Sequence, residues 1–197
     1  MEYFKCKFIG TVKALLIGSS MRGHLSEPYE KLCLSVENGI KFDRHCGPKY
    51  IDARDPHLTG FGIIKGTESR NIRQWSAISQ EELNEVAKGM GIPAIEHGLI
   101  GENLVISGIP DFTKLPVGTQ FLFKSPSGEI RSTVLYSVGA NNPCVIAGEA
   151  IQKAHPDKEN LASLFVKASY GKRGLVGFVL VGGIIKQGDK VYVFIPS

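Results

Sequence analysis

The sequence predicts a mainly β protein, a closed β-barrel with a few inserted helices. Two observations lead to this fold class. Many short segments have the composition or the alternation of β-strands and are separated by turn signals, and only a few segments between them have helical spacing of apolar residues. A chain of 197 residues is long enough for one well-cored domain, so we predict a single domain over residues 1–197.

The strands are indicated by β-branched and aromatic residues and by alternation. Residues 7–17 are rich in Phe, Ile, Val and Leu, and Gly10 interrupts them where a bulge or a close approach of another segment is expected. In the next strand, Leu32, Leu34 and Val36 share one face. Turn residues separate the other expected strands, which lie toward the end of 68–78 and in 101–109, 117–123, 130–138, 175–181 and 190–195.

Helices are expected where apolar residues recur at helical spacing. Ser79 and Glu82 have the spacing of a capping box, and a helix with an apolar face follows until Gly89 and Gly91. A later helix is expected within 156–171, where apolar residues again share one side. These segments are too few to change the fold class, so we treat them as insertions between strands.

The segment 139–144 delivers one thiol to the start of another helix. Asn142 is a good N-cap and Pro143 fits the first helical position, so Cys144 is expected at the second. Unpaired backbone N–H groups and the positive end of the helix dipole favour a thiolate there, which is a better nucleophile, sulfur acceptor and metal ligand than a thiol. The alternative is that Cys144 is a small buried hydrophobic residue, the usual role of a free cysteine.

Charge and hydropathy exclude several classes of protein. Lys and Arg number 23 against 19 Asp and Glu, without a block of like charge, so no nucleic-acid partner is expected. No run approaches the roughly 20 apolar residues that span a bilayer, so no membrane association is expected. The first residues lack a basic segment followed by an apolar one, which argues for a cytoplasmic protein whose cysteines stay thiols.

The densest polar cluster is Asp43-Arg44-His45-Cys46. His45 and Cys46 are residue types found in zinc sites, but neighbours in an extended segment point to opposite sides and no partner pair lies nearby. We favour the interpretation that Asp43, Arg44 and His45 lie at the lip of a pocket for an anionic ligand, with a solvated loop as the alternative. Arg73 has the guanidinium to hold a phosphate, although exposed arginines are more often only solvated.

Short motifs occur in a fixed order along the chain: Leu34-Ser35-Val36, Asn38-Gly39-Ile40, Asp43-Arg44-His45, Arg73-Gln74, Gly101-Glu102-Asn103-Leu104, Leu115-Pro116-Val117-Gly118, Asn142-Pro143-Cys144, Arg173-Gly174 and Gly188-Asp189-Lys190-Val191. In this order they resemble the MOSC domain, which is found at the C-terminus of molybdenum cofactor sulfurases. The resemblance extends from about Thr11 to the end of the chain, and it is to the small stand-alone bacterial members of the family.

The resemblance implies a closed barrel of the pyruvate-kinase-barrel type, a cytoplasmic setting, and Cys144 as the functional thiol. In that family the cysteine is thought to carry sulfur as a persulfide or to ligate molybdenum held by a pterin cofactor. The resemblance also implies a cofactor-binding pocket that contains Glu102, Asn103, Arg173, Arg73, Asp43, Arg44 and His45. Because Asn103 and Arg173 are taken as surface pocket residues, we expect their replacement by Ala to leave the melting temperature within a few degrees.

Two functions follow from the resemblance. In the first, Cys144 accepts sulfur from a cysteine desulfurase or another donor and passes it to a metal–sulfur cofactor acceptor, such as a cluster or the molybdenum cofactor under assembly. In the second, the protein is an oxidoreductase that reduces N-hydroxylated compounds, with Cys144 as the molybdenum ligand and an external reductase as the electron source. A plain anion-binding barrel is a third interpretation.

Two features set the chain apart from the larger enzymes. Many family members have an arginine close to the Pro-Cys pair, whereas this chain has Gly139-Ala140-Asn141-Asn142, which weakens the case for pterin-phosphate binding. The chain also lacks the pyridoxal-phosphate desulfurase domain of the fused sulfurases, and no internal pyridoxal phosphate, flavin or NAD site is expected. Pyridoxal phosphate, sulfur and electrons would therefore come from other proteins.

Overall fold

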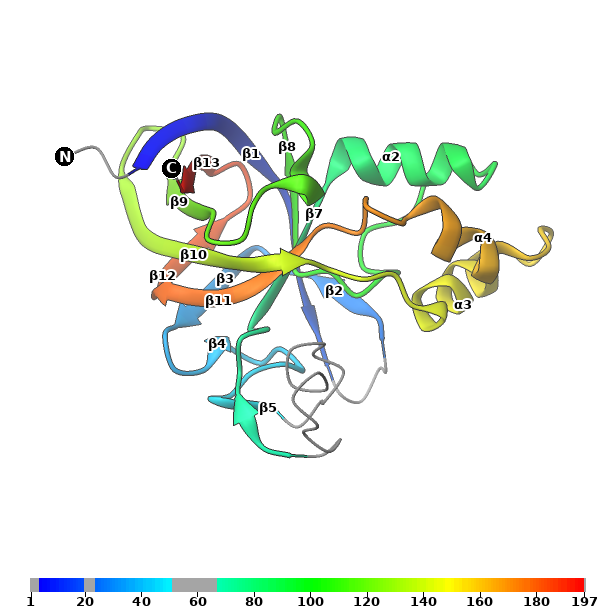
Figure 1. The fold of residues 1–197 in the computed structure, drawn as a ribbon, viewed down its shortest axis with the longest axis horizontal. Coiled ribbons are helices and arrows are strands. Elements are labelled where there is room, and N and C mark those ends of the chain that lie inside the picture. Colours follow the sequence, from blue (N-terminus) through cyan, green and yellow to red (C-terminus); the bar gives the residue numbers. More distant parts are fainter. Residues whose placement is uncertain (1–3, 20–23, 51–66, 197) are drawn as a thin grey trace.

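The centre of the fold is a sheet that closes on itself, seen in a computed structural model that describes residues 4–19, 24–50 and 67–196. Seven strands follow one another in the order β13-β9-β10-β11-β7-β8-β1, and β13 pairs with β1 to complete the barrel (Figure 1). The β7–β8 pair is parallel and its neighbours in the barrel are antiparallel. The expected fold class, a closed barrel with helices inserted between strands, is confirmed.

The barrel strands occupy the segments that alternation and composition indicated. They are β1 (Phe4–Gly18), β7 (Trp75–Ser79), β8 (Leu104–Ser107), β9 (Gln120–Lys124), β10 (Ile130–Ala140), β11 (Leu175–Val181) and β13 (Lys190–Pro196). Shorter strands lie beside the barrel: β2 (Ser26–Pro28) pairs with β1, β3 (Lys31–Ser35) pairs with β4 (Gly39–Ile40) and β12 (Gly183–Lys186), and β5 (Lys49–Tyr50) pairs with β6 (Ser69–Arg70). The sequence indicated β3 but not β12, which begins at the second glycine of a Gly-Gly pair.

Strand β1 is long because it pairs with β13 over its first half and with β8 over its second. Gly10 lies where these two ladders meet, and a Cβ there would lie 2.7 Å from the carbonyl oxygen of Ser107. The close approach expected at Gly10 is therefore confirmed, because only glycine leaves room for the neighbouring backbone. The irregularities in pairing fall on either side of it, between Cys6 and Phe8 and between Val12 and Ala14.

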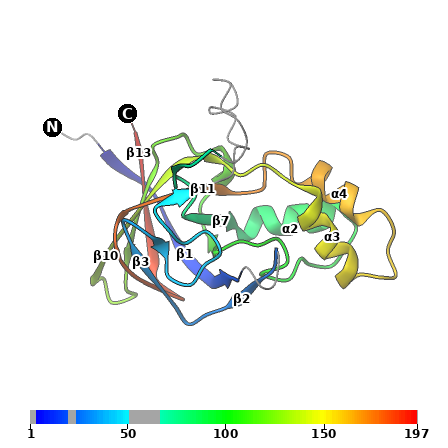
Figure 2. The same ribbon diagram turned by 90° about the horizontal axis from the view of Figure 1, so that it is seen from below.

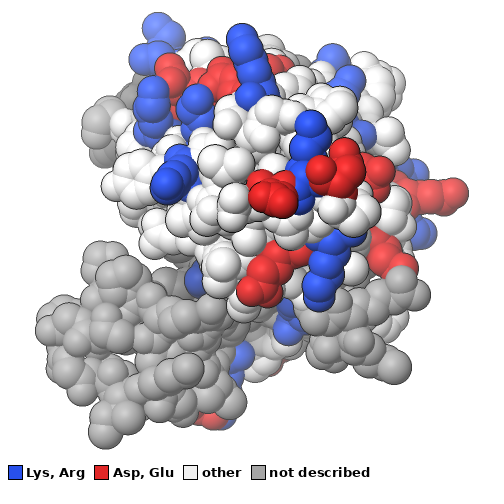
Figure 3. All heavy atoms as spheres, turned by 90° about the vertical axis from the view of Figure 1, so that its right-hand side faces the viewer, with Lys and Arg blue, Asp and Glu red and all other residues white. Residues whose placement is uncertain are grey.

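The described residues include three α-helices, which gather at one end of the barrel (Figures 1 and 2). They are α2 (Gln80–Gly89), α3 (Val145–Ala154) and α4 (Leu161–Ala168), and a short 3₁₀ helix, η2, spans Phe112–Lys114. Figure 3 looks onto the helical end and shows acidic and basic side chains interspersed. None of the helices in the described ranges has the length and apolar content needed to cross a membrane.

Two hydrophobic clusters hold these parts together. One fills the barrel and includes Trp75, Phe112 and Phe121, whose rings contact one another at centroid distances of 5.8 and 5.9 Å. The second joins the helices to the barrel wall and includes Ile100 and Phe165. Burial of apolar surface at about 25 cal/mol per Å² makes both clusters the main source of stability. The second cluster places the helices against the barrel where the candidate site lies.

The start of α2 agrees with the sequence in its cap and differs in its partner. The Ser79 side chain accepts hydrogen bonds from the backbone N–H groups of Glu81 and Glu82, as expected for the N-cap. Glu82 does not close the capping box, because its carboxylate instead accepts hydrogen bonds from the backbone N–H and hydroxyl of Thr113 at 2.9 and 2.6 Å. The sequence spacing located the helix, but a tertiary contact took the side chain.

Candidate functional site

Cys144 lies at the junction of β10 and α3, and it is the N-cap residue of the helix rather than its second residue. The sequence predicted Asn142 as the N-cap and Pro143 as the first helical residue. This prediction is wrong, because the helix begins two residues later. The cause is that the β ladder continues: the backbone N–H of Asn141 donates to Gly174 O at 2.8 Å, and proline disfavours the helical region for the residue before it. The chain thus stays extended until Val145.

This position changes the environment of the thiol. As an N-cap the Cys144 sulfur makes no hydrogen bond to the helix, although it still lies beside the first turn. The side chain is partly buried and packs against the second hydrophobic cluster, which contains Ile100 and Phe165. Val145 and Ile146, by contrast, are exposed. The thiol therefore packs against apolar side chains, and the residues that follow it at the helix start are exposed to solvent.

Arg173 is a buried charged group in the electrostatic environment of the Cys144 thiol. It is only 4% exposed, donates from Nη2 to the carbonyl of Ile100, and lies 6.0 Å from the ring centroid of Phe165. Its Nε has no hydrogen-bond partner. Burial lowers the pKa of the Arg173 guanidinium, while the negative charges of Glu102 and Cys144 act in the opposite direction. The guanidinium is therefore an electrostatic neighbour of the thiol.

A single peptide fixes Arg173 relative to the cysteine segment. Gly174 donates its backbone N–H to the Thr113 hydroxyl at 2.7 Å and accepts the N–H of Asn141 through its carbonyl. Gly174 has φ +83°, and a Cβ at this position would lie 1.9 Å from the carbonyl oxygen of Ala77. Both the conformation and the space require glycine. The Arg173-Gly174 pair thus combines a buried cation with the turn that holds the thiol segment.

Glu102 and His24 form the rest of the buried wall around Arg173. Glu102 is fully buried, its Oε1 accepts the backbone N–H of Gly98 at 2.7 Å, and its Oε2 has no partner. His24 Nε2 lies 2.8 Å from the carbonyl of Ile100. Burial, followed by the charge of Arg173, lowers the pKa of His24 to about 4, so the imidazole is neutral near pH 7. His24 was missed because it lies in a segment without periodicity.

Asn103 and Asp43 brace the site from the barrel side. The Asn103 amide nitrogen donates to Asp43 Oδ2 at 2.7 Å and to the Leu16 carbonyl at 3.3 Å. Its oxygen accepts the backbone N–H and the hydroxyl of Ser76 at 3.0 and 3.2 Å. Asp43 Oδ2 also accepts the N–H of Gly18. With an exposure of 2%, Asn103 is not the surface residue that was expected.

The remaining predicted residues surround this core with cations. Arg44 donates to the carbonyl of Leu25 and, at 3.0 Å, to the Ser26 hydroxyl. Arg73 donates to Asn141 Oδ1 at 3.2 Å, so a guanidinium from another segment contacts the loop that precedes Cys144. Electrostatic effects connect all these groups: the pKa of His24 responds to Arg173, Arg44 and His45, and that of Arg44 to Asp43 and Glu102.

The structure thus brings the predicted site residues into one region, although their roles differ.

The side chains of the described residues give little support for a metal site. Among the described residues, no group of three or more His, Cys, Asp or Glu side chains is arranged to hold a metal ion, so the expected metal ligand Cys144 is not part of such a group. Residues 51–66 lie outside the described residues.

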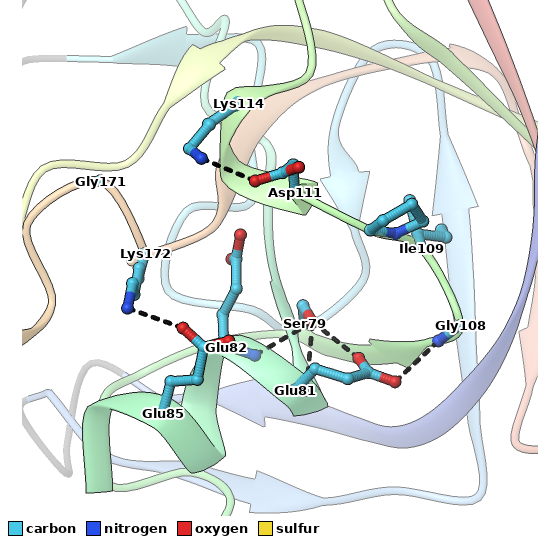
Figure 4. A pocket seen from close by; sticks show the side chains of 11 residues that line it. Ser79, Glu81, Glu82, Glu85, Gly108, Ile109, Asp111, Lys114, Gly171 and Lys172 are labelled. Carbon is cyan, nitrogen blue, oxygen red and sulfur yellow. Dashed lines mark hydrogen bonds and ion pairs between the residues drawn. The ribbon is translucent and has the colours of Figure 1, made fainter. Parts of the chain in front are cut away.

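A cavity of about 630 Å³ lies away from Cys144, beside the start of α2 (Figure 4). Its charged groups pair with one another: Lys114 with Asp111 and Lys172 with Glu85, each at 2.6 Å. Glu82 is also engaged through Thr113. The cavity contains none of the predicted site residues; it is lined by Ser79, Glu81, Glu82, Glu85, Gly108, Ile109, Pro110, Asp111, Lys114, Gly171 and Lys172.

Comparison with protein families identifies the barrel. The family model of the MOSC domain matches residues 62–192, which is more than half of the chain. The chain belongs to the MOSC domain family. The matched range includes Cys144 and Arg173, whereas the segment 43–45 precedes it. The thiol and the buried arginine therefore both lie within the MOSC domain.

Known relatives of this MOSC protein include a Bacillus subtilis (strain 168) protein named "Putative metal-sulfur cluster biosynthesis proteins YuaD". It is 41% identical over 156 residues, which cover 79% of this chain and 76% of that protein. A crystal structure of YuaD from Bacillus subtilis aligns with a TM-score of 0.87 at 34% identity, over 98% of this chain and 100% of that one. The chain is therefore similar to YuaD over nearly its whole length.

A more distant solved structure shares the fold. YiiM from Geobacillus stearothermophilus aligns with a TM-score of 0.59 at 15% identity, covering 93% of this chain and 74% of that one. At this identity the likeness concerns the barrel and not its chemistry.

Proposed function

We propose that the protein is a cytoplasmic sulfur carrier that holds sulfur as a persulfide on Cys144 and delivers it to metal–sulfur cluster or molybdenum cofactor assembly. The observation that carries this proposal is the pairing of a partly buried thiol at a helix start with a buried guanidinium that retains an unused donor. The name of YuaD, a relative at 41% identity that is called a metal-sulfur cluster biosynthesis protein, gives independent support.

The chemistry requires a thiolate and a donor persulfide. The Cys144 sulfur attacks the outer sulfur of the donor, so one S–S bond forms at Cys144 as the donor's S–S bond breaks, and the donor leaves as a thiol. No net electron transfer takes place, and no cofactor in this chain is needed. The positive charge of Arg173 is an electrostatic neighbour of the attacking sulfur. A cysteine desulfurase or another persulfide-bearing protein would supply the sulfur.

The second candidate is an oxidoreductase in which Cys144 ligates molybdenum. Two observations favour it: thiolate is a soft ligand, and the unused donor of Arg173 suits an anionic group such as a pterin phosphate. When bound, the molybdenum cofactor would supply the redox chemistry for N-hydroxylated substrates, and an external reductase would supply the electrons. Cys144 and Arg173 would hold it, while Arg73 already donates to Asn141.

Sulfur loading distinguishes the two functions. Incubation with a cysteine desulfurase, pyridoxal phosphate and cysteine is expected to add one sulfur atom to the Cys144 peptide, and dithiothreitol is expected to remove it. Cys144→Ala should abolish the addition, whereas Cys46→Ala, at another free cysteine, should not. Stoichiometric molybdenum and a fluorescent oxidised pterin in the native protein, without sulfur on Cys144, would favour the oxidoreductase.

A further inference from the structure

Two buried polar atoms of the described residues have no hydrogen-bond partner: Nε of Arg173 and Oε2 of Glu102. Buried polar groups in native proteins are nearly always paired, so each such exception needs a physical explanation. Both side chains are more than nine-tenths buried, and both make one firm contact with the backbone through their other atoms. They are therefore held in place while one atom of each stays unused.

The unused donor belongs to the wall against which the thiol packs. Arg173 contacts Ile100 and Phe165, and Cys144 packs against the hydrophobic cluster that contains these same two residues. Arg173 and the cysteine segment are also fixed by one peptide, because Gly174 O accepts the N–H of Asn141. These contacts place Arg173 and the cysteine segment in one region, and the charge of Cys144 acts on the Arg173 guanidinium.

The other cations near the thiol are already engaged. Arg73 donates to Asn141, Arg44 donates to Ser26, and His24 is neutral near pH 7. Among the described residues, Arg173 is the cation with a buried donor that has no partner, and Glu102 places a negative charge beside it. The Arg173 guanidinium therefore suits one anionic group, because a second anion near it would be repelled by the Glu102 carboxylate.

We propose that Arg173 binds the outer sulfur of the Cys144 persulfide through Nε, and that the Glu102 carboxylate limits how tightly this sulfur is held. The inference rests on the proposed sulfur-carrier function. A persulfide is more acidic than a thiol, so the outer sulfur arrives as an anion and gains a charge-assisted hydrogen bond. In the exchange, the donor's persulfide anion and the Cys144 thiol become the donor's thiol and the Cys144 persulfide anion, and atoms and charge balance.

The test is the equilibrium of sulfur exchange with a small-molecule persulfide. Protein is equilibrated with glutathione persulfide and glutathione at fixed ratios and one pH, and the sulfurated fraction of Cys144 is read by intact mass. Arg173→Gln is expected to lower the exchange constant about tenfold, which corresponds to about 1.4 kcal/mol. Arg173→Lys should restore part of it, because it keeps the charge and loses the planar fork.

The Glu102→Gln variant is expected to change the exchange constant in the opposite direction. Removing the carboxylate charge while keeping the side chain's shape is expected to raise the exchange constant several-fold. A residue with a purely structural role would lower loading in both variants. Lys172→Gln is the matched control, because Lys172 is a cation next to Arg173 in sequence that pairs with Glu85 instead, and it should behave as the wild type.

The outcomes separate the inference from the function on which it rests. If the wild type accepts sulfur and the Arg173→Gln and Glu102→Gln variants share its exchange constant, the inference is wrong and the carrier function stands. If the wild type accepts no sulfur from either a desulfurase or glutathione persulfide, the proposed function itself is wrong. Should Arg173→Gln fail to fold, Arg173→Lys and Glu102→Gln still give the two opposite shifts.

Discussion

Replacement of Asn103 by Ala tests whether this residue belongs to the framework of the barrel. Its amide joins three parts of the chain: the Leu16 carbonyl of β1, the Ser76 backbone and hydroxyl of β7, and the Asp43 carboxylate of the loop after β4. Truncation to Ala removes all four hydrogen bonds and leaves buried partners behind. We therefore expect a large loss of stability, not the few degrees predicted for a surface residue.

The magnitude follows from the partners. The hydrogen bond to the ionised Asp43 is worth about 2 kcal/mol, and the loss of a partner for the Ser76 N–H adds about 2 kcal/mol, so unfolding should become easier by about 4 kcal/mol. In a chain of this size each kcal/mol corresponds to about 3 °C, so the melting temperature should fall by about 12 °C. Urea denaturation monitored by Trp75 fluorescence, together with thermal melts, measures both quantities.

Asn84→Ala is the matched control, because Asn84 is exposed on α2 and its amide oxygen accepts only from Gln80. Its effect is expected to stay within about 0.5 kcal/mol. A loss below about 1 kcal/mol for Asn103→Ala would refute the reasoning, since it would mean that water replaces the four hydrogen bonds. In that case Asn103 would return to the list of ligand-binding residues.

Three further predictions concern the thiol and its support. Iodoacetamide should alkylate Cys144 faster than any other thiol of the chain, because Cys144 lies at a helix start beside the Arg173 guanidinium; peptide mass analysis that finds equal rates would contradict this. Gly174→Ala should destabilise the protein by about 3 kcal/mol or more in urea, whereas Gly171→Ala, with positive φ but open space, should lose about 1 kcal/mol. Burial raises the pKa of Glu82 above its ordinary value of 4.5, so the folded state favours the protonated acid and the wild type should lose stability relative to Glu82→Gln as the pH rises above 4.5. A stability difference that does not change with pH would show that burial does not disfavour this carboxylate.

The sequence predicted what depends on local pattern. Strands with alternating residues and the cap at Ser79 lie where they were expected, because periodicity and capping are properties of neighbouring residues. The helix start at Cys144 was wrong because a long-range ladder, from Asn141 to Gly174, keeps the chain extended past a good local cap.

The family resemblance found the site residues but not how they are used. Asn103 is a polar residue in a polar motif. Nothing in the sequence indicates that its amide forms hydrogen bonds with β1, β7 and Asp43. His24 carries no pattern at all, and its place beside Ile100 depends on contacts 76 positions apart. Such residues are recognised only when the fold brings their partners together.

The Gly174 peptide has a mechanical consequence for the protein. Because it anchors Asn141 on one side and follows Arg173 directly, the spacing of thiol and guanidinium is set in part by the β10–β11 ladder. Because Cys144 is also the N-cap of α3 and Phe165 of α4 contacts Arg173, a movement of either helix would change only the part of this spacing that the ladder does not fix. Amide hydrogen exchange should reflect this division, with Asn141 and Gly174 exchanging on the slow timescale of the barrel and the first turn of α3 exchanging much faster.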